Sequence, residues 1–193
     1  MKILLLIVVT FFASSVYAET EAHVGFFIKN EMSGDDYING VGTEVWLLNE
    51  ETHIGVALNS SIGTAHVADT DNFKHSYVAW DMGIKFGYFS DIFVYGELGF
   101  DLGELILHDR DEDDYDEYED SHDFVDYIVD VFIDDFYDNY GGTNDIDTYI
   151  GAGVGIKFDN VIIEAFSRYR QIDGEYWKAN NQNFSGLKLT VTF

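Results

Sequence analysis

Eight segments of the chain alternate apolar and polar residues with a period of two. The side chains of each segment therefore fall on two chemically different faces, as they do in β-strands. The lengths suit the ~9–11 residues that a tilted strand needs to cross a bilayer, and the segments predict an all-β fold. The predicted strands span residues 22–30, 39–48, 52–63, 76–88, 92–105, 147–158, 161–171 and 184–193.

Short and long connections alternate between these strands. Tight turns are predicted around residues 49–51, 90–91 and 159–160, and the intervening four connections are longer. This regular alternation is typical of bacterial outer-membrane barrels, which have short periplasmic turns and longer surface loops. We therefore expect an eight-stranded antiparallel up-and-down transmembrane β-barrel with both termini in the periplasm.

The chemistry of the two faces separates a membrane barrel from a soluble one. One face is almost purely apolar, and the other carries charges of both signs together with most of the glycines. About eight strands enclose only enough space for side chains, so glycine would make room for charged residues that cross a narrow lumen. A soluble carrier barrel would instead turn the apolar face inward. The predicted lumen ion-pair network comprises Lys29, Glu44, Asp81, Lys85, Glu97, Asp101, Lys157, Glu164, Arg168, Arg170 and Lys188.

Within that network, Glu164 and Arg168 lie four residues apart on one face of a predicted strand. We interpret them as a lumen ion pair rather than as an acid and base couple. Buried pairs of this kind specify a structure more surely than they stabilise it.

The first eighteen residues have the pattern of a secretory signal peptide. Lys2 precedes an apolar run over residues 3–13, and Val16 and Ala18 provide the small residues that a signal peptidase reads. The apolar run is too short for a transmembrane anchor, which needs roughly 20 residues. The prediction is a signal peptide over 1–18 and a single barrel domain over 19–193.

The last strand, residues 184–193, alternates and ends in a terminal Phe193. It resembles the final strand of outer-membrane β-barrels, which the barrel-assembly machinery reads. With the signal peptide, eight strands and paired lumen charges, the chain resembles the class of small barrels formed by the OmpA transmembrane domain and OmpX. The resemblance covers roughly residues 20–193 and is architectural.

This resemblance implies a monomer in the outer membrane of a Gram-negative bacterium, in contact with its lipid and lipopolysaccharide. Full-length OmpA continues into a peptidoglycan-binding domain. The chain stops at Phe193, so no such domain is expected.

An acidic surface loop is predicted over residues 106–146. Residues 109–147 hold 17 of the 36 acids of a chain whose formal charge is −26, a balance that argues against nucleic acid as a partner. Residues 109–120 lack an apolar period and are expected to be extended and mobile. From Asp123 to Asp138, acids recur every three or four residues, which favours an amphipathic helix. The alternative is a hairpin that extends the two flanking strands.

Dense carboxylates suggest weak Ca²⁺ binding, because hard cations prefer oxygen ligands. The fit to an EF-hand is poor, since Asp114 stands where the sharp turn needs Gly. A solvated acidic face is the alternative. The histidines show no zinc spacing, and His53 is expected in the lumen. No other cofactor is predicted. The candidate calcium ligands are Asp109, Asp111, Asp113, Glu117 and Asp120.

Catalytic residues are not predicted. His75-Ser76 and Ser121-His122 are the adjacent Ser and His pairs, but neighbours on a strand point to opposite faces and Ser121 lies in the acidic loop. We expect a non-enzymatic, cell-surface outer-membrane barrel whose loops contact the envelope, cations or external partners. The alternative is a porin-like narrow ion or solute pore, and a lipid-modifying enzyme is favoured less.

Overall fold

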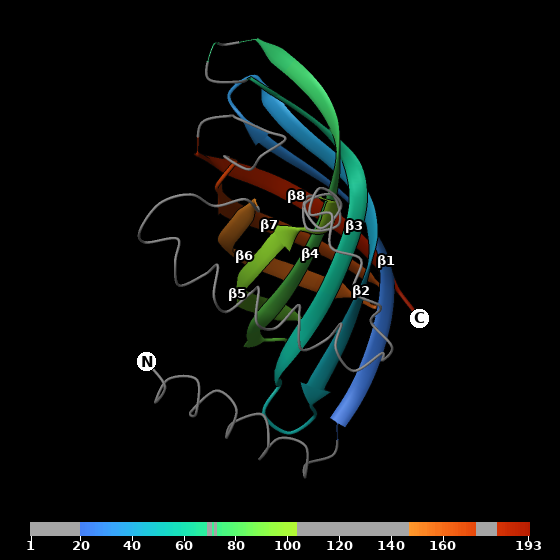
Figure 1. Ribbon diagram of the computed structural model, residues 1–193. Helices are drawn as coiled ribbons and strands as arrows, with labels where there is room; N and C mark the ends of the chain where they lie inside the picture. Colours follow the sequence, from blue (N-terminus) through green and yellow to red (C-terminus); the bar gives the residue numbers. More distant parts are fainter. Residues whose placement is uncertain (1–19, 69–70, 72, 104–146, 173–180) are drawn as a thin grey trace, which may run out of the picture.

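The computed structural model describes residues 20–68, 71, 73–103, 147–172 and 181–193. Eight strands form its framework (Figure 1). They are β1 (Thr20–Ser33), β2 (Asp36–Asn49), β3 (Ile54–Ala68), β4 (Lys74–Tyr88), β5 (Ile92–Asp101), β6 (Thr148–Phe158), β7 (Val161–Arg170) and β8 (Gln182–Thr192).

Each strand pairs with its sequence neighbours in antiparallel register, and β1 pairs with β8 to close the barrel. The closing ladder runs from Gly25 opposite Thr192 to Met32 opposite Ser185. The prediction of an all-β, eight-stranded, antiparallel up-and-down barrel is therefore confirmed. Closure removes the free strand edges through which open sheets aggregate.

The predicted strands match the observed ones, with differences at their ends. The predicted first strand stops at residue 30, but β1 continues to Ser33. The predicted third strand stops at residue 63, but β3 continues to Ala68. The fifth was predicted to residue 105, but β5 ends at Asp101. There the side chain of Asp101 accepts a hydrogen bond from the backbone N–H of Gly103 at 2.8 Å, which turns the chain out of the ladder.

One end of the barrel carries the turns that join β2 to β3, β4 to β5 and β6 to β7, and we call it the turn end. The turn from Asn49 to Ile54 is held by Asn49 Oδ1, which accepts the N–H of Thr52 at 2.8 Å. His53 has a φ of 55° and is exposed in this turn, so its predicted place in the lumen is wrong. Asp159, with a φ of 49°, supplies the left-handed residue that the two-residue turn between β6 and β7 requires.

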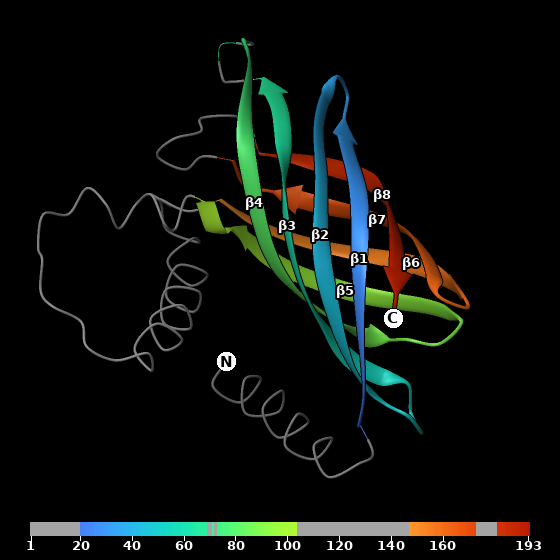
Figure 2. The ribbon, with the colours of Figure 1, turned by 90° about the vertical axis from the view of Figure 1, so that its right-hand side faces the viewer.

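The opposite end, which we call the loop end, is uneven. A long connection was predicted between the first two strands, but the two-residue turn Gly34-Asp35 joins β1 to β2 here, with a φ of 60° at Gly34, so that prediction is wrong. β1 to β4 are 14 or 15 residues long, whereas β5 to β8 have 10 or 11. The β1–β2 and β3–β4 hairpins therefore project beyond the other strands (Figure 2). The backbone N–H of Asp101 donates to the carbonyl oxygen of Asp147 at 2.8 Å, so β5 and β6 remain bridged at this end.

The outer surface of the barrel is apolar. Alternate residues of the strands are exposed, and large hydrophobic side chains occupy these positions around the barrel. Phe26 is 59% exposed on β1, Val78 65% on β4 and Leu187 63% on β8. A soluble protein rarely exposes a continuous apolar surface of this extent.

The interior is layered along the barrel axis. On β2, the charged Glu44 lies between the apolar Ile38, nearer the loop end, and Trp46, nearer the turn end. The loop-end apolar cluster consists of Ile38, Ala65, Val67, Ala79, Ile172 and Phe184. The turn-end apolar cluster consists of Trp46, Ala57, Phe89, Phe93, Tyr95, Ile162 and Phe166.

Glycine makes room for the large interior rings. A Cβ added at Gly99 would lie 2.2 Å from Cζ of Tyr149, and one added at Gly155 would lie 2.2 Å from Cζ of Phe93. Both distances are far below van der Waals contact. β5 at Gly99 and β6 at Gly155 can therefore approach these rings only because glycine has no side chain.

The predicted signal peptide over 1–18 lies outside the described residues, as does the acidic loop over 106–146 with its helix or hairpin. In the described part of the chain, no helix is long and apolar enough to cross a membrane.

Candidate functional site

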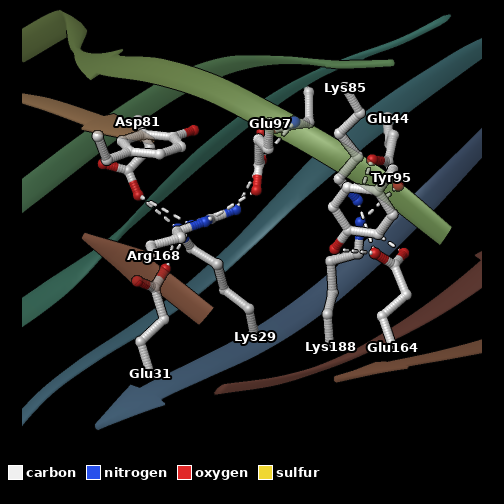
Figure 3. Close-up of polar contacts among 12 residues, drawn as sticks. Lys29, Glu31, Glu44, Asp81, Lys85, Tyr95, Glu97, Glu164, Arg168 and Lys188 are labelled. Atoms are coloured by element: carbon white, nitrogen blue, oxygen red, sulfur yellow. Dashed lines mark hydrogen bonds and ion pairs between the residues drawn. The ribbon is translucent and has the colours of Figure 1, made fainter. Parts of the chain in front are cut away.

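Charged side chains fill the middle of the barrel, because successive residues of a strand point alternately outward and inward and the charged residues occupy the inward positions. On β7, inward positions recur at every second residue and place Glu164, Arg168 and Arg170 inside, each at most 6% exposed. The facing strands supply the opposite partners, and the contacts form two groups (Figure 3). The loop-side cluster is Lys29, Glu31, Asp81, Glu97, Arg168 and Arg170, and the turn-side cluster is Glu44, Lys85, Glu164 and Lys188.

Arg168 binds two carboxylates of the loop-side cluster. Its Nε and Nη2 donate to the two oxygens of Glu97 at 3.0 and 2.8 Å, which is a bidentate pair. Its Nη1 donates to Glu31 Oε1 at 2.6 Å. Asn59 Nδ2 donates to Glu97 Oε1 at 3.1 Å, so this carboxylate has several donors.

Arg170 and Lys29 complete the loop-side cluster. Arg170 binds Asp81 in a bidentate pair at 3.0 and 2.7 Å, and its Nε donates to Glu31 Oε2 at 3.0 Å. Lys29 Nζ donates to Glu31 Oε1 at 2.9 Å and also to Asp81. The cluster therefore balances its cations and carboxylates and is neutral as a unit.

The turn-side cluster is a closed ring of four ions. Lys85 Nζ lies 2.7 Å from Glu44 Oε1 and 2.6 Å from Glu164 Oε2. Lys188 Nζ lies 2.5 Å from Glu44 Oε2 and 2.8 Å from Glu164 Oε1. Tyr95 Oη donates to Glu164 Oε2 at 2.8 Å. Each lysine contacts both carboxylates. With two lysines and two carboxylates, this cluster is also neutral.

Aromatic rings lie against the cations of both clusters. The guanidinium carbons of Arg168 and Arg170 each lie 4.6 Å from the ring centroid of Tyr149. Lys85 Nζ lies 4.2 Å from the ring centroid of Tyr95. These cation–π contacts give a desolvated cation a favourable partner besides its carboxylates.

Nine of the predicted lumen residues lie in the two clusters, and two lie elsewhere. Asp101 is buried, but its carboxylate accepts backbone N–H groups of Trp80 at 3.3 Å and Gly103 at 2.8 Å. Lys157 is half-buried at the turn end of β6, beyond both clusters. The residues in the clusters are Lys29, Glu44, Asp81, Lys85, Glu97, Glu164, Arg168, Arg170 and Lys188.

The interpretation of Glu164 and Arg168 as one ion pair is wrong. They share the inner face of β7, but Arg168 binds Glu31 and Glu97, whereas Glu164 binds Lys85 and Lys188. Four residues of strand span about 13 Å, which is too long for a direct contact between the two groups.

Sequence reasoning missed Glu31, which is fully buried and accepts hydrogen bonds from Lys29, Arg168 and Arg170. The predicted strand stopped one residue short of it. The signal was present, because Glu31 follows Lys29 by two residues and therefore shares its face.

A pocket of about 190 Å³ opens at the turn end of the interior. Trp46, Phe89, Phe93 and Ile162 form its apolar wall, and Lys157 is at its polar rim. The same pocket is also lined by Glu21, His23, Leu48, His53, Ser90, Asp91 and Thr192.

A histidine and a serine meet on the outer face near the loop end. His66 on β3 lies opposite Ser76 on β4, and His66 Nδ1 is 2.7 Å from Ser76 Oγ, while the ring of Tyr37 stacks on His66. Sequence reasoning considered His75 with Ser76 and missed this cross-strand pair. No carboxylate among the described residues binds His66, so a third group to orient it as a base is not seen there.

The candidate calcium ligands between Asp109 and Asp120 lie outside the described residues, as do His108, Ser121 and His122. Within the described ranges, no group of three His, Asp or Glu side chains is arranged to hold a metal ion.

No protein-family model matches the chain, and no curated protein is significantly similar to it in sequence. Function is therefore inferred from the fold and from the chemistry of its interior and its surface.

Proposed function

We propose that the protein is a non-enzymatic β-barrel of the Gram-negative outer membrane, whose surface loops contact the envelope, cations or external partners. The observation that carries this proposal is the inverted distribution of side chains. Large hydrophobic residues such as Ile92, 73% exposed, face outward, while Lys85 and Glu44 are buried inside. Lipid would cover the outer surface, and closure satisfies the backbone groups that lipid cannot.

The interior supports a barrel that does not conduct. Two neutral ionic clusters occupy its middle, and an apolar cluster lies toward each end. An eight-stranded barrel has room for side chains rather than for an aqueous channel. A plugged membrane barrel serves as a scaffold for its loops, which is the basis of the proposed surface role.

The last strand supports assembly in the outer membrane. β8 closes the barrel against β1, and Phe193 is 75% exposed beside Phe26, with the two ring centroids 5.6 Å apart. An exposed terminal aromatic residue on the closing strand suits recognition by the barrel-assembly machinery. Both ends of the described chain lie at the turn end, which the proposal assigns to the periplasm.

The test is expression of the full chain in a Gram-negative host, followed by membrane fractionation and electrophoresis with and without boiling. We expect a mature protein beginning at Glu19 in the outer-membrane fraction, with faster migration before boiling because the closed ladder resists unfolding in detergent. Recovery from the soluble periplasm with a single migration position would disprove the membrane proposal.

A narrow ion or solute pore remains the second candidate, because charged side chains do line the interior. Conductance in planar bilayers separates the two. We expect no single-channel steps from the purified barrel, and regular steps that vanish on unfolding would favour the pore. The His66 and Ser76 pair motivates one further measurement, mass analysis of lipid A from expressing cells, in which we expect no change.

A further inference from the structure

The turn-end pocket has the size and the walls of a binding site for a single ring. An apolar cavity of about 150 Å³ can bind benzene, so a pocket of about 190 Å³ holds one ring and a small substituent. Trp46, Phe89, Phe93 and Ile162 are each at most 7% exposed, which makes the wall largely preformed. Pockets that combine a preformed apolar wall with a few well-placed polar groups are typical of small-molecule sites, and here the apolar wall lies beside seven polar or charged lining residues.

Lys157 favours a negatively charged ligand in this pocket. It is half-buried, and its side chain makes no ion pair or hydrogen bond with any described residue, unlike the lysines of the two clusters. The rim histidine His23 is already 3.2 Å from Glu21. Two carboxylates, Glu21 and Asp91, also line the pocket, but both side chains are exposed to solvent, whereas Lys157 is half-buried.

The acid-rich segment is attached to the barrel at the end opposite the pocket. The acid-rich segment joins β5 to β6, and its attachment points, Gly103 and Asp147, are at the loop end. The pocket is at the other end of the ten-residue β5. Ten residues of strand span about 33 Å, and salt screens exposed charges beyond about 8 Å.

We propose that this pocket binds a small organic anion with one aromatic ring, namely a monocyclic aromatic carboxylate. The ring would pack on Trp46 and Phe93, and the carboxylate would pair with Lys157 Nζ at the rim. The same chemistry is offered by a free acid and by the C-terminal residue of a peptide that ends in Phe. This site goes beyond the proposed surface role, and its binding chemistry holds whichever compartment the turn end faces.

Trp46 in the wall makes binding measurable. The full-length mature chain is reconstituted in nanodiscs with Trp80→Phe and Trp177→Phe, so that Trp46 alone fluoresces. The probe is 4-bromophenylacetate, whose heavy atom quenches a nearby indole. We expect saturable quenching, and roughly tenfold weaker binding of the uncharged 4-bromophenylacetamide, because a charge-assisted hydrogen bond contributes about that factor.

Variants of Lys157 complete the test. Lys157→Gln should weaken binding of the acid about tenfold and leave binding of the amide unchanged, whereas Lys157→Arg should retain most of the affinity for the acid. Lys74→Gln, a lysine at the opposite end of the barrel, is the matched control and should change neither. The acid and amide comparison on unsubstituted Lys157 keeps the test valid if a variant does not fold.

A second arm distinguishes the two sources of the carboxylate. The peptide acetyl-Ala-Ala-(4-bromo-Phe), with a free C-terminus, is titrated beside 4-bromophenylacetate. Tighter binding of the peptide would support a peptide terminus, and tighter binding of the free acid would support a small metabolite-like acid. Quenching that does not saturate, or equal affinity for acid and amide, would overturn the proposal.

Discussion

Arg168 and Arg170 share Glu31, and each also holds a second carboxylate, Glu97 or Asp81, through two nitrogens. None of these pairs is isolated, so the effect of losing one residue depends on what remains. Removing a cation leaves buried carboxylates without their charge partner and exposes the full desolvation penalty of those groups.

Arg168→Ala should therefore lower the free energy of unfolding by about 3–5 kcal/mol. Lys74→Ala is the matched control, since Lys74 is exposed and lies 3.9 Å from Asp36, and surface pairs contribute only about 0–1 kcal/mol. Urea unfolding of the reconstituted barrel, followed by tryptophan fluorescence, measures both. Equal midpoints for the two variants would contradict the interior position of Arg168.

The turn-side ring allows a charge-balanced test. Lys188→Met leaves Glu44 and Glu164 to share Lys85, whereas the double variant Lys188→Met with Glu44→Gln leaves one balanced pair, Lys85 with Glu164. We expect the double variant to be more stable than the single variant by about 1–3 kcal/mol. The same urea titration on both proteins and on Glu44→Gln gives the coupling energy, and additive losses would argue against the ring.

The interior residues could be predicted from the sequence wherever they shared a face within a recognised strand. Lys29, Lys85 and Arg168 were assigned to the interior in this way. Glu31 was missed only because the predicted strand ended too early. Which charge binds which could not be predicted, because the partners of Arg168 lie 71 and 137 residues away in the chain and depend on how the strands are staggered.

The strands show how well a period of two predicts elements and where it fails. The continuation of β3 past residue 63 places the small Ala65 and Val67 inside. Small residues give weak alternation, so the extension was invisible to a pattern that relies on contrast between large apolar and charged side chains. The strand order was predicted from the alternation of short and long connections, although the first connection, predicted to be long, has only two residues.

Glycine positions on β5 provide a test at the level of the strand. Gly99→Ala should destabilise the barrel by about 1–3 kcal/mol, because its Cβ would lie 2.2 Å from Cζ of Tyr149 and force the ring to move. Gly96 is on the same strand but exposed, with no neighbouring atom within 4 Å of an added Cβ. Gly96→Ala should therefore be neutral or stabilising by about 0.5–1 kcal/mol.

Unfolding of both glycine variants in urea distinguishes a specific clash from a general effect of alanine in β5. A loss at Gly96 as large as the loss at Gly99 would show that the strand does not tolerate Cβ atoms on either face. It would then contradict the assignment of Tyr149 as the cause.

For the whole molecule, we expect the barrel to fold independently of its acid-rich segment. β5 and β6 are bridged at the base of that segment by the hydrogen bond from Asp101 to Asp147, and their ladder is complete without it. Residues 109–138 contain 15 acids by sequence, and their mutual repulsion is relieved more by divalent ions than by sodium at equal ionic strength. We therefore expect the eight strands to form the stable barrel and the acid-rich segment to respond to divalent cations.

Replacing residues 109–138 by a short Gly and Ser link should leave folding intact, because a change of loop length alters the closure entropy little. The shortened protein should keep its faster migration before boiling. In the full-length protein in liposomes, calcium should slow proteolysis of this segment relative to sodium at matched ionic strength, because carboxylates bound to Ca²⁺ are drawn together. Identical cleavage rates would remove the cation role, and failure of the shortened protein to fold would make the segment part of the scaffold.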